Sequence, residues 1–422
     1  MRVCVLGAGV IGLTTAWELA ERGYDVTILD RRREPGAETS FANGAQLSYS
    51  FVAPLAAPET LVKLPSLIFS TAAPIRIRPT YDPDFIRWGL GFIRACNDRM
   101  VAETTKAQLA LGALSRSVLT DLAQRQSLSF GLRTAGKLVL HRKEKNFEAA
   151  KTQVRRQNAS GGSEQEVLSS SQCLALEPSL RLKANELAGG VYTPSEQVGD
   201  CRLFCEDLAD RLRQRNNVRW QLGTHVRGLV VHEGRVRAVD TSQGEIDTDL
   251  VVLALGAGAP HFARQSGFRL PIYPMKGYSI TARPEPGTEA LRHSVTDLDR
   301  KIVYAPLRED GADVVRVAGI ADLVGFDRRV DERRLAGMTR QAANTLKLDL
   351  ESDVRPWAGL RPATPDSRPI IGWSPVANMF LNTGHGALGW TLACGSARLS
   401  AQMIAKEQAS VDPSWFAFDR KT

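Results

Sequence analysis

The chain has 422 residues, of which 43% are hydrophobic and 24% are charged, and its formal net charge is +8. This length exceeds that at which a single hydrophobic core keeps growing, so two domains are expected, and the composition excludes long disordered segments. The basic residues are spread along the chain instead of forming blocks, which argues against nucleic-acid binding, although a diffuse positive field would attract anionic lipids or small anionic substrates.

The first element predicted in chain order is a short buried strand at residues 2–6, which stops at a glycine-rich turn. A helix with apolar positions at i, i+3, i+4 and i+7 follows, Gly23 ends it, and a second strand covers residues 26–29. This order of strand, turn, helix and strand is typical of a dinucleotide-binding unit, in which the pyrophosphate lies at the positive end of the helix.

Each glycine of the turn has a separate physical role in such a unit. Gly7 permits the tight turn, Gly9 lets the backbone approach a pyrophosphate, and Gly12 lets the helix lie against the strand. Asp30, which ends the second strand, is placed to accept hydrogen bonds from ribose hydroxyls, and it argues against NADP, whose additional phosphate it would repel. The arginines at positions 31–33 are either solvated loop charges or include one that reaches a cofactor phosphate.

Beyond residue 50 the pattern is mixed. A strand is predicted at 137–141, a charged surface helix at about 143–158, and an amphipathic helix from its cap Asp200 to about Arg213. Strand patterns follow, in chain order, at 217–221, 225–231, 235–240, 250–255, 271–282 and 301–319. A strand at 379–382, a glycine turn and a helix with one apolar face close the chain.

The six cysteines show no spacing typical of disulfide-stapled or zinc-bound domains, and no metal site is expected. Cys201 and Cys205 lie on one apolar helical stripe and are interpreted as core residues. No signal-peptide pattern opens the chain, and no apolar run reaches the ~18 residues of a spanning helix, so a cytoplasmic, reducing location is expected.

Five motifs occur in order along the chain: VCVLGAGVIG (3–12), ETSFANGAQL (38–47), YPMKGY (273–278), WAGLRPATPD (357–366) and NTGHGALGWTLAC (382–394). Together they resemble the bacterial D-amino acid dehydrogenases, which belong to the wider D-amino acid oxidase and glycine oxidase group of flavoproteins. The resemblance runs over essentially the whole chain. It implies an α/β fold with a Rossmann-like FAD-binding domain built from separated segments, and an α+β substrate domain with a mixed, largely antiparallel sheet.

The expected FAD-binding domain comprises residues 1–55, 165–265 and 355–422, and the expected substrate domain comprises 56–164 and 266–354. Small and polar side chains at 39–46 suit a loop beside a flavin, although an ordinary surface loop has the same composition. The residues expected at the cofactor are Gly7, Gly9, Val10, Ile11, Gly12, Asp30, Arg31, Ser40, Asn43, Gly44, Ala45, Gln46, Leu47, Val226, Gly256, Gly384, Gly386, Leu388 and Gly389.

Oxidation of an amino acid at Cα requires a carboxylate clamp, a neutral amine and a flavin N5 placed to accept hydride. The resemblance implies that Arg361 is the clamp, because a guanidinium holds a carboxylate with two parallel hydrogen bonds; a surface charge is the alternative. Tyr278 and Tyr304 are expected either to contact this carboxylate or cover the pocket, or to be half-buried strand aromatics. His385 is expected either to contact substrate and tune a pKa, or to be structural.

Residues 61–93 carry more apolar side chains than a one-faced helix needs. They are either substrate-domain core or a peripheral patch on the cytoplasmic face of the inner membrane, which would suit a dehydrogenase that passes electrons to a quinone. Three functions are therefore open. They are a D-amino acid dehydrogenase reoxidised by a quinone or other carrier, including one that prefers D-proline or hydroxyproline; an oxygen-using oxidase of glycine, sarcosine or D-amino acids; and a nucleotide-binding protein without catalysis.

Overall fold

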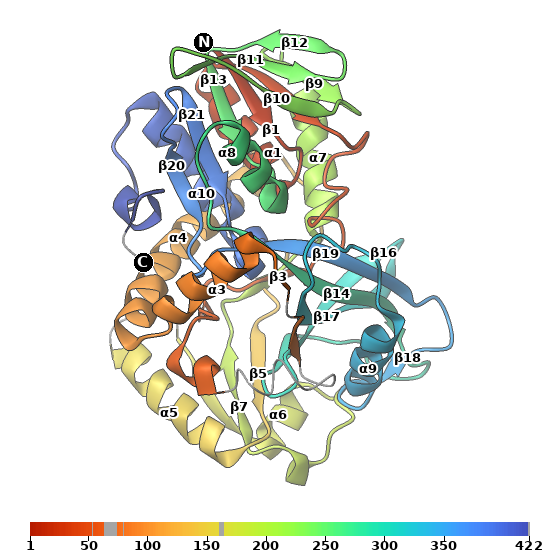
Figure 1. Cartoon of the computed structure of the whole chain (residues 1–422). Helices are drawn as coiled ribbons and strands as arrows, with labels where there is room; N and C mark the ends of the chain where they lie inside the picture. Colours follow the sequence, from red (N-terminus) through yellow and green to blue (C-terminus); the bar gives the residue numbers. More distant parts are fainter. Residues whose placement is uncertain (53, 63–73, 79, 160–163, 421–422) are drawn as a thin grey trace.

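A computed structural model of the chain describes all residues except 53, 63–73, 79, 160–163 and 421–422. Two large β-sheets organise these residues, one in the upper and one in the lower half of Figure 1. Each sheet joins strands that are far apart in the sequence, so each half of the molecule contains several separate stretches of the chain.

The upper sheet has six strands and is parallel except at one edge, where β20 runs antiparallel to β21. Its strands are, in spatial order, β20 (Ile370–Trp373), β21 (Met379–Thr383), β13 (Leu250–Leu253), β1 (Arg2–Leu6), β2 (Asp25–Asp30) and β9 (Val218–Leu222). One face is covered by the helices α1 (Val10–Glu21), α7 (Cys201–Arg213) and α10 (Gly389–Ala405). The other face is covered by α8 (Ala259–Gln265) and the three-stranded sheet of β10 (Val226–His232), β11 (Arg235–Thr241) and β12 (Gly244–Asp247).

Burial on both faces explains why β1 is a nearly continuous apolar run. Val3 and Val5 pack into the core under α1 and α10, whereas Cys4 and Leu6 pack into the core on the other face. A parallel strand with helices or a second layer on both sides is apolar at nearly every position, and residues 3–6 show this pattern after the exposed Arg2.

The lower sheet has ten strands, and all its pairings are antiparallel except β5 with β15 and β4 with β17. Its main path is β18 (Leu348–Asp349), β14 (Tyr273–Pro284), β17 (Ala312–Leu323), β16 (Ile302–Glu309), β15 (Ser294–Asp297), β5 (Lys137–His141), β7 (Gly189–Thr193) and β6 (Glu166–Ser169). Two further strands are β19 (Arg355–Ala363), which pairs with β14, and β4 (Ile75–Ile77), which pairs with β17.

The two faces of the lower sheet have different neighbours. Tyr278 and Ile280 of β14 share a core with Met338 of α9 (Glu332–Ala343). Ser279, between them, points the other way, and its hydroxyl donates to the carbonyl oxygen of Ala42 at 2.6 Å. The segment around residues 39–48 therefore lies against the face of the sheet that α9 does not cover.

Long helices complete the lower half of the molecule. They are α3 (Pro83–Ala95), α4 (Asp98–Arg125), α5 (Glu144–Ala159) and the short α6 (Ser170–Leu176). Helix α4 packs along α10, and the two backbones approach so closely that a Cβ atom at Gly395 would lie 2.6 Å from the Leu111 carbonyl oxygen. The remaining elements are the pair β3 (Gln46–Leu47) and β8 (Gln197–Val198) and the 3₁₀ helices Ala184–Glu186, Gly256–Gly258, Gly386–Leu388 and Pro413–Phe416.

The α/β class and the mixed, largely antiparallel second sheet are confirmed. The strand predicted at 137–141 coincides with β5, and Asp200 caps α7 by accepting from the backbone N–H groups of Arg202 and Leu203. The pattern at 301–319 resolves into the hairpin of β16 and β17. Helix α4 was not predicted from the sequence, because its apolar stripe is diluted by threonine, glycine and serine.

Three parts of the chain lie differently from the expected domain boundaries. Strands β6, β7 and β19 pair within the ten-stranded sheet, although their residues were expected in the FAD-binding domain. Helix α4 was expected in the substrate domain, but its Leu111 and Leu119 share the core of α1 and α10. Backbone pairing and shared apolar contacts join segments remote in sequence, so we propose boundaries that follow the two sheets and their covering helices.

Candidate active site

The N-terminal glycine turn joins β1 to α1 in the geometry that a dinucleotide site requires. Gly7 has φ +112°, and a Cβ atom there would lie 2.6 Å from the Ala254 carbonyl oxygen. A Cβ atom at Gly12 would lie only 1.8 Å from the Gly7 carbonyl oxygen. At Gly9, by contrast, the nearest atom to an added Cβ is the Ser40 hydroxyl oxygen at 3.5 Å. Packing within the protein thus excludes a side chain at Gly7 and at Gly12, whereas the space beside Gly9 is open.

Asp30 holds the turn from the end of β2. Its carboxylate accepts from the backbone N–H groups of Ala8 and Arg32, both at 2.8 Å, and it retains lone pairs for a ribose. Arg31 donates to Glu38 Oε1 at 2.9 Å, so its charge is compensated by a neighbouring carboxylate. Val226 follows two residues after Thr224, whose N–H donates to the Asp30 carbonyl oxygen, and this places Val226 near the same end of the sheet.

The segment at 39–48 runs from the glycine turn across the lower sheet. At its start the Ser40 hydroxyl accepts from the Val10 N–H at 3.1 Å, at the beginning of α1. Asn43 bends the backbone, since its side-chain oxygen accepts from the N–H of Ala45, which has φ +54°. A Cβ atom at Gly44 would lie 3.3 Å from Val303 of β16, so the segment lies directly on the sheet.

The end of this segment is held between the two halves of the molecule. The Gln46 side-chain amide donates to the carbonyl oxygens of Val295 and Tyr304 in the lower sheet, at 3.2 and 3.3 Å. Leu47 is fully buried in the core under α10, and Ile11 of α1 packs against that core. Residues 44–47 therefore lie between the lower sheet and the core under α10.

Two further glycine turns meet the end of β19. Gly256 has φ +52°, and no atom of the described residues lies within 4 Å of a Cβ atom built there; the same is true of Gly386, with φ +55°. The 3₁₀ helices that contain these glycines both contact β19. Gly384 is fixed by packing, because a Cβ atom there would lie 2.8 Å from Thr364. Leu388 and Gly389 begin α10, whose positive end therefore faces this region.

Arg361 lies on β19 where these segments converge. Its guanidinium lies over Gly277 of β14, where a Cβ atom would come within 2.4 Å of the nearest guanidinium nitrogen. Its only hydrogen bond among the described residues is a long one, 3.5 Å, to the Ile320 carbonyl oxygen, and no described carboxylate lies within 4 Å. Burial lowers the pKa of Arg361 to about 10, so the side chain stays charged at neutral pH.

The Ile320 carbonyl is directed at Arg361 by a β-bulge. Gly277 pairs with Ala321 and Tyr278 pairs with Gly319, so Ile320 is the additional residue on β17. It has φ +41°, which is unusual for a β-branched residue and marks local strain. Bulges of this kind re-aim groups beside active sites.

The structure does not bring Tyr278 or Tyr304 to Arg361. The Tyr278 hydroxyl donates to buried Asp322 at 2.8 Å, on the face of the sheet that α9 covers. Burial and this carboxylate raise the pKa of Tyr278. Tyr304 is fully buried in the same core, where burial raises the pKa of its hydroxyl. Both strands are buried on both faces, so residue type alone did not distinguish the face toward Arg361 from the opposite one.

His385 lies in the turn beside the end of β19. It forms an isolated β-bridge with Ala363, two residues after Arg361 on that strand. Its ring is 3% exposed, and its Nε2 atom is buried without a hydrogen-bond partner among the described residues. Burial lowers the pKa of His385 to about 3, so the imidazole is neutral at physiological pH. A neutral ring with a free nitrogen can form one hydrogen bond to a ligand without a change of charge.

These features fit a bound dinucleotide with a flavin ring. The open faces of Gly9, Gly256 and Gly386 form a cradle that side chains would fill, and His385 offers an orphaned polar atom beside it. FAD placed here would be held by the turn at Gly7–Gly12, by Asp30, and by the backbone of residues 40–47. Among the described residues no group of three histidines, cysteines or acids is arranged to hold a metal ion.

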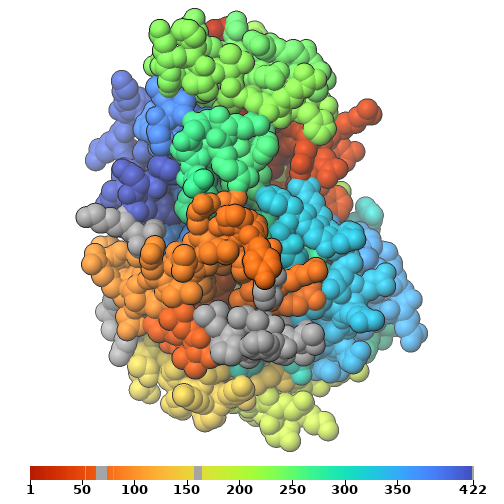
Figure 2. All heavy atoms as spheres, viewed as in Figure 1, coloured from red at the N-terminus to blue at the C-terminus, as the bar shows by residue number. Residues whose placement is uncertain are grey.

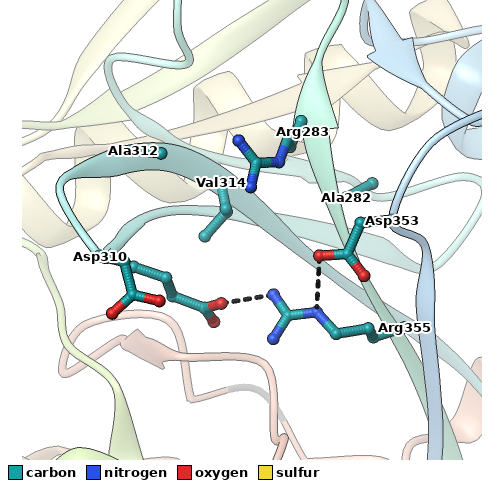
Figure 3. A pocket seen from close by; sticks show the side chains of 8 residues that line it. Ala282, Arg283, Asp310, Ala312, Val314, Asp353 and Arg355 are labelled. Carbon is teal, nitrogen blue, oxygen red and sulfur yellow. Dashed lines mark hydrogen bonds and ion pairs between the residues drawn. The ribbon is translucent and has the colours of Figure 1, made fainter.

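A surface pocket of about 240 Å³ lies elsewhere, at the far end of the lower sheet. Arg355 within it forms ion pairs with Glu309 and with Asp353, the second of which is labelled in Figure 3. Arg355 begins β19, six residues and about 20 Å along the strand from Arg361. Because the Arg355 charge is compensated locally by two carboxylates, we assign this pocket no part in the chemistry.

Two polar residues at the site were not singled out from the sequence. Arg316 is 5% exposed and donates to the Asn43 carbonyl oxygen at 3.1 Å, which fixes the segment at 39–48 to β17. Lys137 is buried on β5 beside Gln46. The available signal was a basic residue within an otherwise apolar strand, which indicates a charge with a buried partner.

Comparison with known proteins places the chain in a class. Residues 2–403 match the family described as FAD dependent oxidoreductase. The chain is 42% identical to D-amino acid dehydrogenase 2 of Pseudomonas aeruginosa over 97% of this chain and 96% of that protein. It is 41% identical to D-amino acid dehydrogenase 2 of Ralstonia nicotianae over the full length of both.

The chain is therefore an enzyme of the FAD-dependent oxidoreductase family, and within that family it belongs to the group of the D-amino acid dehydrogenases. Its fold is also that of glycine oxidase from Geobacillus kaustophilus, with a TM-score of 0.78 at 22% identity over 100% of this chain and 99% of the other. L-proline dehydrogenase from P. horikoshii matches with a TM-score of 0.76 at 18% identity, over 99% and 96% of the two chains.

Proposed function

We propose that the protein oxidises D-amino acids at Cα to imines, which hydrolyse to 2-oxo acids and ammonia, and passes the electrons to a quinone or another carrier. The observation that carries this proposal is the charged, partly buried Arg361, which has no carboxylate partner among the described residues. It lies on β19, which the 3₁₀ helices Gly256–Gly258 and Gly386–Leu388 both contact. The relatives named D-amino acid dehydrogenase support the choice of substrate.

In this mechanism the substrate carboxylate is the acidic partner of Arg361 and accepts two parallel hydrogen bonds from the guanidinium. The Ile320 carbonyl limits the rotation of the guanidinium, so the carboxylate is held in one orientation. His385 stays neutral and offers Nε2 to the substrate, which must lose its ammonium proton before reaction. Bound FAD supplies the hydride acceptor, and the positive end of α10 favours negative charge beside it.

The direct test is anaerobic mixing of the purified holoenzyme with D- and L-amino acids, glycine, sarcosine and the prolines. We expect loss of flavin absorbance with D-amino acids and slower or no change with their L enantiomers. Flavin that no amino acid reduces would contradict the proposal and would favour a nucleotide-binding protein without catalysis.

The electron acceptor is tested with the same substrates in air. A carrier-dependent dehydrogenase is expected to reduce a soluble quinone rapidly and to form little hydrogen peroxide. Peroxide formed in step with substrate oxidation would instead make the protein an oxidase, the activity that the structural neighbour from Geobacillus kaustophilus is named for.

Replacing Tyr278 by phenylalanine separates the two roles that the sequence left open for this side chain. We expect KM to stay within about twofold, while the free energy of unfolding falls by about 1–3 kcal/mol, because buried Asp322 loses a hydrogen bond. Steady-state kinetics and denaturant unfolding measure the two effects. A tenfold rise in KM at unchanged stability would show instead that the hydroxyl contacts substrate.

We also propose that α3 contacts the cytoplasmic face of a membrane, where a quinone would be reached. Ile86, Leu90 and Ile93 recur on one helical face and are 48%, 51% and 49% exposed, and α3 lies on the surface seen in Figure 2. Arg87 and Arg94 lie on the same helix and would attract anionic lipid. Leu64, Leu67, Ile68 and Phe69, which belonged to the same expectation, lie outside the described residues. No helix in the described part of the chain is both long and apolar enough to cross a bilayer.

Cosedimentation with vesicles of anionic and of neutral phospholipid tests this contact. We expect the wild type to bind anionic vesicles and the double variant Ile86→Glu and Leu90→Glu to stay in solution, with unchanged activity toward a soluble quinone. Val231→Glu is the matched control, since Val231 is 41% exposed on β10 in the other half of the molecule. Equal binding by all three proteins would exclude α3 as the contact.

A further inference from the structure

Lys137 is a buried lysine whose side chain reaches residues 39–48, which are called the cofactor segment below because the proposed function places them beside the flavin. It begins β5 and is 3% exposed. Its Nζ atom donates to Ser48 Oγ at 2.7 Å and to Gln46 Oε1 at 3.1 Å, and it lies 4.6 Å from the centre of the Phe51 ring. No described carboxylate lies within 4 Å of this ammonium group.

The contacts of Lys137 orient two polar side chains of the cofactor segment, Gln46 and Ser48. With its oxygen bound to Lys137, the Gln46 amide directs its NH₂ group to the carbonyls of the lower sheet. Ser48 accepts from Lys137, and its N–H donates to the Thr391 hydroxyl in the first turn of α10. Through Ser48, Lys137 is thus linked to the backbone of the cofactor segment and to the positive end of α10.

The other groups that face Lys137 do not neutralise it. Glu196, which follows β7, is the nearest acidic influence on its charge, but both carboxylate oxygens already accept from the N–H groups of Tyr49 and Ser50. Thr193 of β7 and Ser294 of β15 are its neighbours in the sheet and carry no charge. Burial lowers the pKa of Lys137 to about 8, so it is charged at neutral pH and neutral above that value.

A buried charge without a close counter-ion is costly, and a purely structural bridge between Gln46 and Ser48 would be made more cheaply by a neutral side chain. We propose that Lys137 is a positioning residue that acts through Gln46 and Ser48 and makes the bound flavin easier to reduce by placing a positive charge behind the cofactor segment. This inference rests on the proposed function only for the place of the flavin. An anion-stabilising charge favours the reduced cofactor, which gains negative charge.

The midpoint potential of the flavin in the holoenzyme tests this proposal, measured by equilibration with reference dyes so that no amino acid is needed. At pH 7 we expect K137M to lower the potential by about 30 mV, which is a tenfold change in the equilibrium constant of a two-electron couple. The midpoint potential of the wild type is expected to approach that of K137M as the pH rises through about 8, because the lysine then loses its charge. K137R should keep the higher potential throughout this range, since its guanidinium stays charged.

K276M is the matched control. Lys276 is also buried in the lower sheet, but its Nζ atom donates to the Arg329 carbonyl oxygen on the face toward α9, and its replacement should leave the potential unchanged. Equal potentials for wild type and K137M, or an equal drop in K276M, would overturn the proposal. If K137M does not fold, the proposal is tested by comparing how the flavin midpoint potentials of the wild type and of K137R change with pH. If D-amino acids do not reduce the flavin, the proposed function is contradicted. The comparison of midpoint potentials would still test the role of Lys137.

Discussion

Replacing Arg361 by alanine is expected to lower kcat/KM for every carboxylate substrate by about 30-fold to several thousand-fold. Truncating one partner of a buried charge pair costs about 2–5 kcal/mol, much of it because the other charge is left unpaired. The guanidinium has no other described acidic partner, so the loss falls on the substrate and not on the fold. Most of the change should appear in KM, with a further fall in kcat if the carboxylate also sets the position of Cα.

Two variants make this result specific to the clamp. Arg361→Lys keeps a positive charge but not the planar fork, and it should recover only part of the affinity. Arg355→Ala removes an arginine from the same strand whose charge is compensated by Glu309 and Asp353, and kcat/KM should remain near that of the wild type. A KM for Arg361→Ala equal to that of the wild type would mean that the substrate carboxylate is bound elsewhere.

Replacing Gly9 by alanine is expected to lower the affinity for FAD by about 10- to 100-fold while the apoprotein keeps most of its stability. The backbone at Gly9 is extended, with φ −78°, and a Cβ atom there would lie 3.5 Å from the nearest atom in the described part of the chain, the Ser40 hydroxyl oxygen. Its cost to the protein is therefore that of a weaker helix cap, at most about 1 kcal/mol. Toward a dinucleotide the same methyl group occupies space that the backbone must leave free, an overpacking cost of about 1–3 kcal/mol.

Substitutions at two other glycines serve as controls for Gly9→Ala. Gly12→Ala should abolish soluble, folded protein, because its Cβ atom would overlap the Gly7 carbonyl oxygen. Gly258→Ala should change neither stability nor affinity, since the nearest atom to the new Cβ lies at 3.9 Å. Flavin absorbance during titration of the apoprotein gives the affinity, and thermal unfolding of the apoprotein gives the stability. Unchanged FAD affinity in Gly9→Ala would place the pyrophosphate away from this turn.

Much of the nucleotide half could be predicted from the sequence, because its signals are local. The strand, the glycine turn, the helix and Asp30 follow one another within about 30 residues. The steric reason for Gly12 lies within the turn, at the Gly7 carbonyl oxygen, whereas that for Gly7 lies at Ala254, far along the chain. The family resemblance then pointed to Arg361 and His385. It did not show that Arg361 has no acidic partner among the described residues, or that its guanidinium lies over Gly277 beside the bulge at Ile320.

The faces of the lower sheet could not be predicted in the same way. A strand that is covered on both sides is apolar at every position, so the alternation that separates inside from outside is lost. The sequence therefore placed Tyr278 and Tyr304 in strands but not on a face, and the tertiary structure turns the Tyr278 hydroxyl toward Asp322.

By itself, the sequence determined the order of the elements, the dinucleotide turn and the presence of a guanidinium in the G-L-R-P motif. Only the tertiary structure decided which groups the buried charges contact. Lys137 meets Gln46 across 91 residues of chain, and Arg316 meets Asn43 across 273. Such contacts depend on strand register and on the packing of one sheet against the other, and no local spacing encodes either of them.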